Sequence, residues 1–187
     1  MNVYISQGSE TKVMVKADEN LLDIIRTEVD NHTLKITTTE NIRRATSKRV
    51  DVTMPEISGI TAVAGSNAFS ENVLRSKSLE INGSAGSNIK LEVDAGKINT
   101  SASAGSNIKL GGKVRSFTGK ASSGANIKAE ELKAVQCNAR TSSGANLWIT
   151  VSDELEAHAS SGGNIIYYGQ PKTIDTESSS GGNIVKK

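Results

Sequence analysis

Several polar residues near the C-terminus carry groups that acid and base chemistry requires: carboxylates, an imidazole and a guanidinium. Carboxylic acids and imidazoles can transfer protons to and from a substrate, as a β-helical polysaccharide lyase or hydrolase would need. Ordinary pairing of opposite charges on a solvated surface explains the same residues, so catalysis is the alternative hypothesis. The candidate residues are Arg140, Glu156, His158, Asp175 and Glu177, with Asn138 beside them.

These residues can meet only if a repeated element stacks them, and the chain contains such an element. Three small residues followed by Asn recur seven times, as in Ala85-Gly86-Ser87-Asn88. The asparagines are 21, 19, 19, 20, 18 and 19 residues apart, and a short fixed period indicates a solenoid in which each repeat packs on its neighbours. The asparagines are Asn67, Asn88, Asn107, Asn126, Asn146, Asn164 and Asn183.

Apolar residues alternate on both sides of each Asn, which predicts two or more strands per repeat with every second side chain pointing inward. The sequence has neither the hexapeptides of left-handed β-helices nor the nonapeptides of calcium-loaded β-rolls. We therefore expect an all-β fold: a right-handed parallel β-helix of about seven short rungs. One inward row, nine positions before each Asn, consists of Leu79, Ile98, Phe117, Cys137, Leu155 and Ile174, so Cys137 should be a buried, inert thiol.

The asparagines themselves are expected to be structural. Glycine and asparagine both tolerate the left-handed backbone of a tight turn. Stacked strands lie about 4.8 Å apart, so each Asn amide could hydrogen-bond to the Asn of the next rung. The sequence therefore predicts a ladder of asparagine side chains along the turns.

The first third of the chain lacks the repeat. Residues 1–56 show short segments of alternating polarity separated by turn residues, which predicts an antiparallel β meander that caps the solenoid. The β-helix repeats are assigned to residues 57–187.

Binding residues are expected on outward rows, because inward rows are occupied by packing. The row two places after each Asn begins with Phe69 and contains Lys90, Lys109 and Lys128. The lysines either belong to a solvated face or form a groove for an anionic sugar. Further along, Trp148, Ile166 and Val185, with Tyr168 nearby, would form an exposed apolar patch. Self-association through these C-terminal rungs is the preferred interpretation and carbohydrate binding the next, unless a loop or the N-terminal segment covers the patch.

Three segments and the repeats together resemble a known family. Asn2–Gly8, Ala17–Leu22, Val50–Pro55 and the Gly-X-Asn repeats are similar to the "putative auto-transporter adhesin, head GIN domain" family, uncharacterised cell-envelope proteins common in Bacteroidetes. The resemblance runs over essentially the whole chain and implies a right-handed β-helix that is exported to the periplasm or cell surface. The family brings no catalytic residues, and this chain lacks a signal region.

Composition excludes several functions. A net charge of +2 with interspersed signs argues against a nucleic-acid partner. One cysteine excludes an internal disulfide and a multi-cysteine metal site, and no metal or cofactor is expected. No apolar run approaches the roughly 18 residues that span a bilayer. The sequence thus favours a non-enzymatic envelope module, a candidate adhesin that presents a rigid surface for self-association or glycan contact.

Overall fold

Each complete coil of the molecule is one long β-strand that starts at a repeat Asn and bends near its middle. Most inward positions along these strands are valine, leucine, isoleucine, phenylalanine or alanine and are buried, with Thr100, Gly119 and Cys137 among the exceptions in residue type, while the positions between them face solvent. This alternation is the reason the chain stays extended, since a helix would bury polar and apolar residues together. The long strands are β9 (Asn88–Ala102), β10 (Asn107–Ala121), β11 (Asn126–Thr141) and β12 (Asn146–Ala159).

The first and last coils are built from shorter strands on the same plan. The computed structural model describes residues 1–42 and 45–187. The shorter strands are β6 (Gly59–Ala62), β7 (Asn67–Ser70), β8 (Leu74–Gly83), β13 (Asn164–Tyr168), β14 (Thr173–Ser178) and β15 (Asn183–Lys186).

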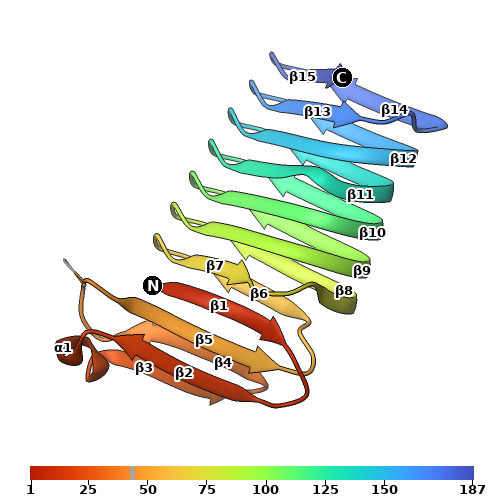
Figure 1. Cartoon of the computed structure of the whole chain (residues 1–187). Coiled ribbons are helices and arrows are strands. Elements are labelled where there is room, and N and C mark those ends of the chain that lie inside the picture. The colour runs from red at the N-terminus through yellow and green to blue at the C-terminus, as the bar shows by residue number, and fades with distance from the viewer. Residues whose placement is uncertain (43–44) are drawn as a thin grey trace.

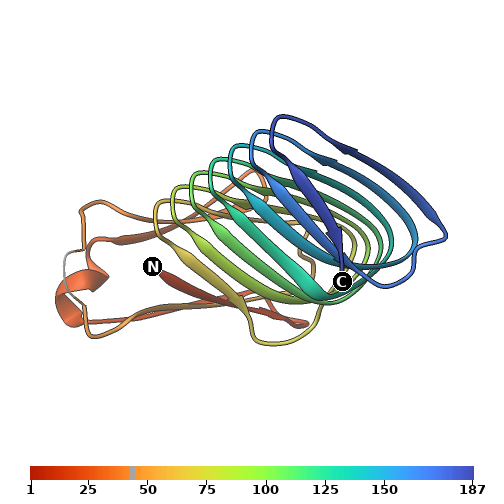
Figure 2. The same cartoon turned by 90° about the horizontal axis from the view of Figure 1, so that it is seen from above.

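The coils stack in parallel and in register. Asn107 lies opposite Asn88 on one side and Asn126 on the other, and the strands also pair beyond the bend, with a register shift between β10 and β11 after Lys109. Figure 1 shows the tight turns in one row and the broader bends in another, and Figure 2 shows the coils lying one behind the next. The expected all-β solenoid of about seven coils is confirmed.

The tight turns require two successive left-handed residues, but asparagine is not one of them. In the second repeat Ala85 has φ of 50° and Gly86 has φ of 71°, and the amide of Ser87 donates to the carbonyl of Ser84 at 3.2 Å. This is the pattern of a type I′ turn. Asn88 begins the next strand, so the expectation that Asn supplies left-handed backbone is wrong. Asparagine recurs at this position because its side chain forms hydrogen bonds between successive coils.

The core is a narrow column of stacked side chains between the two faces of the coil. Residues of the inward row defined above are at most 4% exposed from Leu79 to Leu155, and Phe117 is among the largest fully buried side chains. In the last coil the equivalent Ile174 is 46% exposed. The core is therefore covered along its length and open at the end formed by β14 and β15.

The N-terminal segment is joined to the solenoid more closely than a separate meander would be. Strand β1 pairs in parallel with both β5 and β7, so it extends one face of the coil stack, and β2 pairs antiparallel with β5. The β3–β4 hairpin forms a small antiparallel sheet of its own. These elements are β1 (Asn2–Gln7), β2 (Lys12–Ala17), α1 (Glu19–Leu22), β3 (Ile25–Asp30), β4 (Thr33–Thr38) and β5 (Lys48–Met54).

The parallel direction of β1 differs from the predicted antiparallel meander. Alternating polarity identifies a strand and its buried face, but it carries no information about the partner or its direction. The pairing is supported by Gln7, whose side-chain amide donates to the carbonyls of Pro55 and Arg75 at 2.9 and 3.0 Å. The oxygen of the same amide accepts from the Arg75 backbone amide at 2.6 Å. Gln7 thus ties the end of β1 to the start of β8.

Candidate functional site

One outward row crosses the whole length of the solenoid. Lys90, Lys109 and Lys128 are paired in register on successive coils. On one side the row continues through Phe69 to Tyr4 of β1, whose rings are 5.2 Å apart between centroids. On the other side it continues from Lys128 into the apolar residues of the last coils.

At the C-terminal end, Trp148 lies opposite Ile166, and Ile166 lies opposite Val185. Tyr168 is paired with Thr150, on the same face and two residues further along. Trp148, Ile166 and Tyr168 are half-buried and Val185 is 37% exposed. We call Trp148, Ile166, Tyr168 and Val185 the C-terminal patch.

The three lysines of the row differ in their partners. Lys90 and Lys128 are exposed, while the ammonium of Lys109 lies 2.8 Å from a carboxylate oxygen of Glu131. The hydrogen bond to Glu131 raises the pKa of Lys109 above its usual value. The row therefore keeps its positive charge, but one lysine is already paired within the chain.

The asparagine row forms a continuous hydrogen-bonded ladder. The amide nitrogen of Asn88 donates to the side-chain oxygen of Asn67 at 2.9 Å, and that of Asn126 donates to Asn107 at 3.0 Å. The ladder reaches back to Asn2, which accepts from Asn67 at 2.8 Å. It includes Asn67, Asn88, Asn107, Asn126, Asn146 and Asn164; Asn183 pairs in register with Asn164 through the strand backbone.

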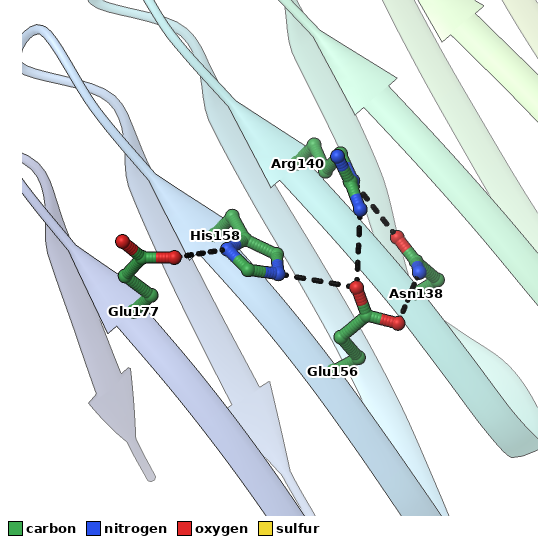
Figure 3. A network of polar contacts seen from close by, with 5 residues as sticks. All are labelled: Asn138, Arg140, Glu156, His158 and Glu177. Carbon is green, nitrogen blue, oxygen red and sulfur yellow. Dashed lines mark hydrogen bonds and ion pairs between the residues drawn. The ribbon is translucent and has the colours of Figure 1, made fainter.

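The candidate acid and base residues lie on the opposite face and contact one another (Figure 3). One carboxylate oxygen of Glu156 is 3.1 Å from Nη2 of Arg140 and 3.1 Å from Nε2 of His158. The other ring nitrogen of His158 is 3.1 Å from a carboxylate oxygen of Glu177. The second oxygen of Glu156 accepts from the amide of Asn138. Asp175 is in register with Glu156, but its side chain forms no hydrogen bond among the described residues.

This arrangement limits what the cluster can do. Both oxygens of Glu156 and both ring nitrogens of His158 face partners within the cluster. A neutral imidazole could donate a hydrogen bond to only one of the two carboxylates that flank the ring. The side chains of Glu156, His158 and Arg140 are 39%, 33% and 53% exposed, so water can screen these contacts.

Cys137 occupies the inward row, 4% exposed. Burial raises the pKa of its thiol to about 12, so almost no thiolate exists at neutral pH. Among residues 1–42 and 45–187 there is no group of three or more histidine, cysteine or acidic side chains that could hold a metal ion. The described residues also contain no helix with the length and apolar character needed to cross a bilayer.

The sequence did not reveal that Ile174 is exposed in the last coil. Ile174 belongs to a row that is buried in each earlier coil. Its position in the row predicts that the side chain points inward, but it does not predict whether a neighbouring coil covers it. β14 is exposed at every residue, and β15 at all but Ile184.

Comparison with known proteins gives one family and a common fold. A family model described as "Putative auto-transporter adhesin, head GIN domain" matches residues 1–171. No curated protein matches the sequence at a significant level.

Several solved structures share the fold at low sequence identity. A protein described as a putative adhesin from Bacteroides fragilis superposes with a TM-score of 0.92 at 20% identity, covering 100% of this chain and 88% of its own. A putative adhesin from Parabacteroides merdae gives 0.78 at 16% identity, with 100% and 88% coverage. A putative lipid binding protein from Parabacteroides distasonis gives 0.73 at 20% identity, with the same coverage.

Proposed function

Because the chain belongs to the family described as "Putative auto-transporter adhesin, head GIN domain", we propose that it is a non-enzymatic module of the cell envelope. In this proposal the protein is exported to the periplasm or cell surface. Its stacked coils hold one rigid outward face in place, and that face makes contacts with other molecules.

Self-association through the last coils is the function that the geometry supports best. The observation that carries it is the coincidence of the C-terminal patch with the open end of the core at Ile174. Edge strands with unpaired backbone groups are templates for pairing, and exposed apolar side chains beside them add a driving force for association.

The charges of the last two strands favour one arrangement of two copies. β14 carries Asp175 and Glu177, whereas Lys186 and Lys187 lie at the end of β15. β15 contains no acidic residue, so two copies of β15 side by side would offer the lysines no opposite charge. A two-fold arrangement with β14 of one copy beside β15 of the other brings acids to lysines, and it pairs the strands antiparallel.

The test is the mass of the protein in solution as a function of concentration, measured by sedimentation equilibrium. We expect reversible association in the wild type. Trp148→Ala should weaken it at least about tenfold, because large aromatic side chains commonly carry much of the energy of an interface. Lys90→Ala, in the same outward row but five coils from β15, is the matched control and should leave the association unchanged.

A monomer at every concentration, or equal association of the wild type and Trp148→Ala, would contradict the proposal. Val185→Lys provides a second variant that adds charge to an already exposed position. It should also reduce association, and its effect should be partly reversed by high salt.

Contact with a glycan is a second way in which the outward face could bind another molecule. Its site would be the row formed by Lys90, Lys109 and Lys128. Lys90 and Lys128 are exposed and lie one coil to either side of Lys109. Their charges would suit an anionic polysaccharide whose acidic groups recur along the row. Retention on immobilised alginate that is reduced by Lys90→Ala with Lys128→Ala, and not by Trp148→Ala, would support this site. Equal retention of all variants would reject it.

The enzymatic alternative depends on the cluster of Arg140, Glu156, His158, Asp175 and Glu177. Four of these five side chains are engaged with one another, and an acid or base already paired on an exposed surface has less reason to transfer protons to a substrate. Activity on a panel of polysaccharides that disappears in His158→Ala would support the enzyme and count against the proposal above.

A further inference from the structure

The two faces of the coil end in different strands. β15 continues the face that carries the lysine row, because β15 pairs with β13, β13 with the first part of β12, and β12 with β11. β14 pairs with the last part of β12, so it continues the opposite face, which carries the acid and base cluster. A tight turn joins the two strands, so β14 and β15 run in opposite directions on opposite faces.

This placement decides where the lysine rows point when two copies meet. In the two-fold arrangement proposed above, on which the following inference rests, β14 of one copy lies beside β15 of the other. Each side of the resulting rod then consists of the lysine face of one copy and the cluster face of the other. The two lysine rows therefore point in opposite directions, one from each half of the rod.

The two rows are also separated along the axis of the rod. Lys109 lies four coils before Val185 in its row, so the two copies of Lys109 are about nine coil spacings apart. At about 4.8 Å per spacing this is roughly 43 Å. Distance and direction together keep the two rows apart as separate sites.

One anionic chain is poorly suited to occupy both rows. A chain that lies on the lysines of one copy and continues past the last coil meets Asp175 and Glu177 of the second copy, and like charges repel. Both residues are exposed, and the side chain of Asp175 forms no hydrogen bond with another described residue. The acids of β14 thus limit each bound chain to the lysine row of one copy.

We propose that the dimer cross-links anionic polysaccharides, with one chain bound along the lysine row of each copy and the two chains on opposite sides of the rod. Lys90 and Lys128 supply the free ammonium groups, since both are exposed and neither forms an ion pair among the described residues. Lys109 between them is already paired with Glu131. The carboxylates or sulfates of the chain meet these ammonium groups.

Rows that point in opposite directions behave differently from rows on one side. On a single flat surface coated with polysaccharide, only one row of the dimer touches the surface, so dimerisation adds no avidity. Between two coated surfaces both rows bind, and the dimer joins the surfaces. A dimer with β15 beside β15 has both rows on the same side, and its avidity on one surface would strengthen binding about a hundredfold or more.

The test compares retention on a flat alginate-coated sensor with the aggregation of alginate-coated beads. The wild type should be retained and should aggregate the beads at concentrations at which sedimentation shows a dimer. Trp148→Ala should be retained within about twofold of the wild type, but it should cause at least about tenfold less aggregation. Lys90→Ala with Lys128→Ala should still form the dimer, and it should neither be retained nor aggregate the beads.

Two further variants serve as control and as a test of the arrangement. Lys120→Ala removes an exposed lysine from the opposite face and should change neither retention nor aggregation. Asp175→Lys should weaken dimer formation at least about fivefold, and adding Lys186→Glu in the same chain should restore it, because opposite charges then face each other again. No effect of Asp175→Lys would reject the pairing of β14 with β15.

The outcomes separate this inference from the proposed function. A wild type that forms dimers and is retained on the sensor, yet does not aggregate the beads, would reject cross-linking and leave self-association standing. Equal bead aggregation by Trp148→Ala, or retention that falls at least about tenfold in that variant, would also reject it. A wild type that stays monomeric would reject both, and sedimentation identifies that case. Aggregation of anionic lipid vesicles without aggregation of alginate beads would rule out a polysaccharide as the ligand.

Discussion

At the scale of single residues, the asparagine row is stabilised by side-chain bonds between coils. Each amide in the middle of the ladder both donates to the preceding Asn and accepts from the next, as Asn126 does with Asn107 and Asn146. A residue at this position must have a donor and an acceptor at fixed separation, and asparagine is the shortest side chain that offers both. This is why the residue recurs although its backbone is an ordinary strand.

Asn126→Ala should lower the free energy of unfolding by about 1–2 kcal/mol, because two ladder hydrogen bonds are lost. Chemical denaturation measures the change. Lys128→Ala, two residues along the same strand and exposed, should cost less than about 0.5 kcal/mol. Equal effects of the two substitutions would mean that the ladder does not contribute to stability.

The asparagine row could be predicted because the same residue recurs at nearly constant spacing. A side chain such as Gln7 gave no comparable signal, since its hydrogen bonds connect β1 to residues that are distant in sequence and follow no period. The contacts within the cluster around Glu156 were predictable as neighbours in register, but their distances depend on rotamers that a sequence does not specify.

At the scale of elements, the coils are shaped by where each strand turns. The tight turns tolerate alanine or serine with positive φ in the first position. The broad bend of β10 is more demanding, because Gly112 has φ of 104° and any Cβ there would collide with the carbonyl oxygen of Val93 in the neighbouring coil. The register between neighbouring coils also shifts at the bends of β10 with β11 and of β11 with β12, so the shape of the bends could not be derived from the repeat.

Gly112→Ala should destabilise the protein by about 1–3 kcal/mol or more, since both the backbone angle and the space are unsuitable for a side chain. Gly105→Ala is the control: its φ is 70° and a Cβ there would meet nothing within 4 Å, so it should cost about 1 kcal/mol. Thermal unfolding of both variants compares the two costs, and a smaller loss in Gly112→Ala would show that the bend can relax.

The stability of the N-terminal strands should depend on pH through the carboxyl group of Asp51. Its carboxylate lies 2.9 Å from the ammonium of Lys16 and 2.6 Å from Nε of Arg49. Burial alone would raise the pKa of Asp51, but the hydrogen bonds from Lys16 and Arg49 outweigh it and leave the pKa below its usual 3.8. The contribution to stability is then complete above about pH 4 and is lost as pH falls through the lowered pKa.

Urea denaturation of the wild type and Asp51→Asn should therefore show a stability difference that is constant near neutral pH and shrinks below about pH 4. Comparing the two proteins cancels the titration of other acids. Lys16→Met should reduce the size of this difference, because it removes one of the two cations. A difference that grows on acidification would have the wrong sign and would refute the assignment.

At the scale of the whole molecule, regular stacking gives a rigid body with two different ends. The N-terminal end is closed by β1, β5 and β2, whereas the C-terminal end leaves Ile174 46% and Val185 37% exposed. The sequence predicted the stack because every coil repeats the same rows. It did not predict the parallel pairing of β1 or the exposure of Ile174, because each depends on which neighbour a strand has rather than on its own pattern.

The central claim is that the open end and the C-terminal patch are where two copies meet. Hydrogen exchange of backbone amides, compared between dilute and concentrated protein, tests it at the level of single strands. We predict that residues 173–178 and 183–186 become more protected as concentration rises, while β1, β2 and β5 do not change. Protection that is independent of concentration at β14 and β15, or that increases at β2 instead, would contradict the claim.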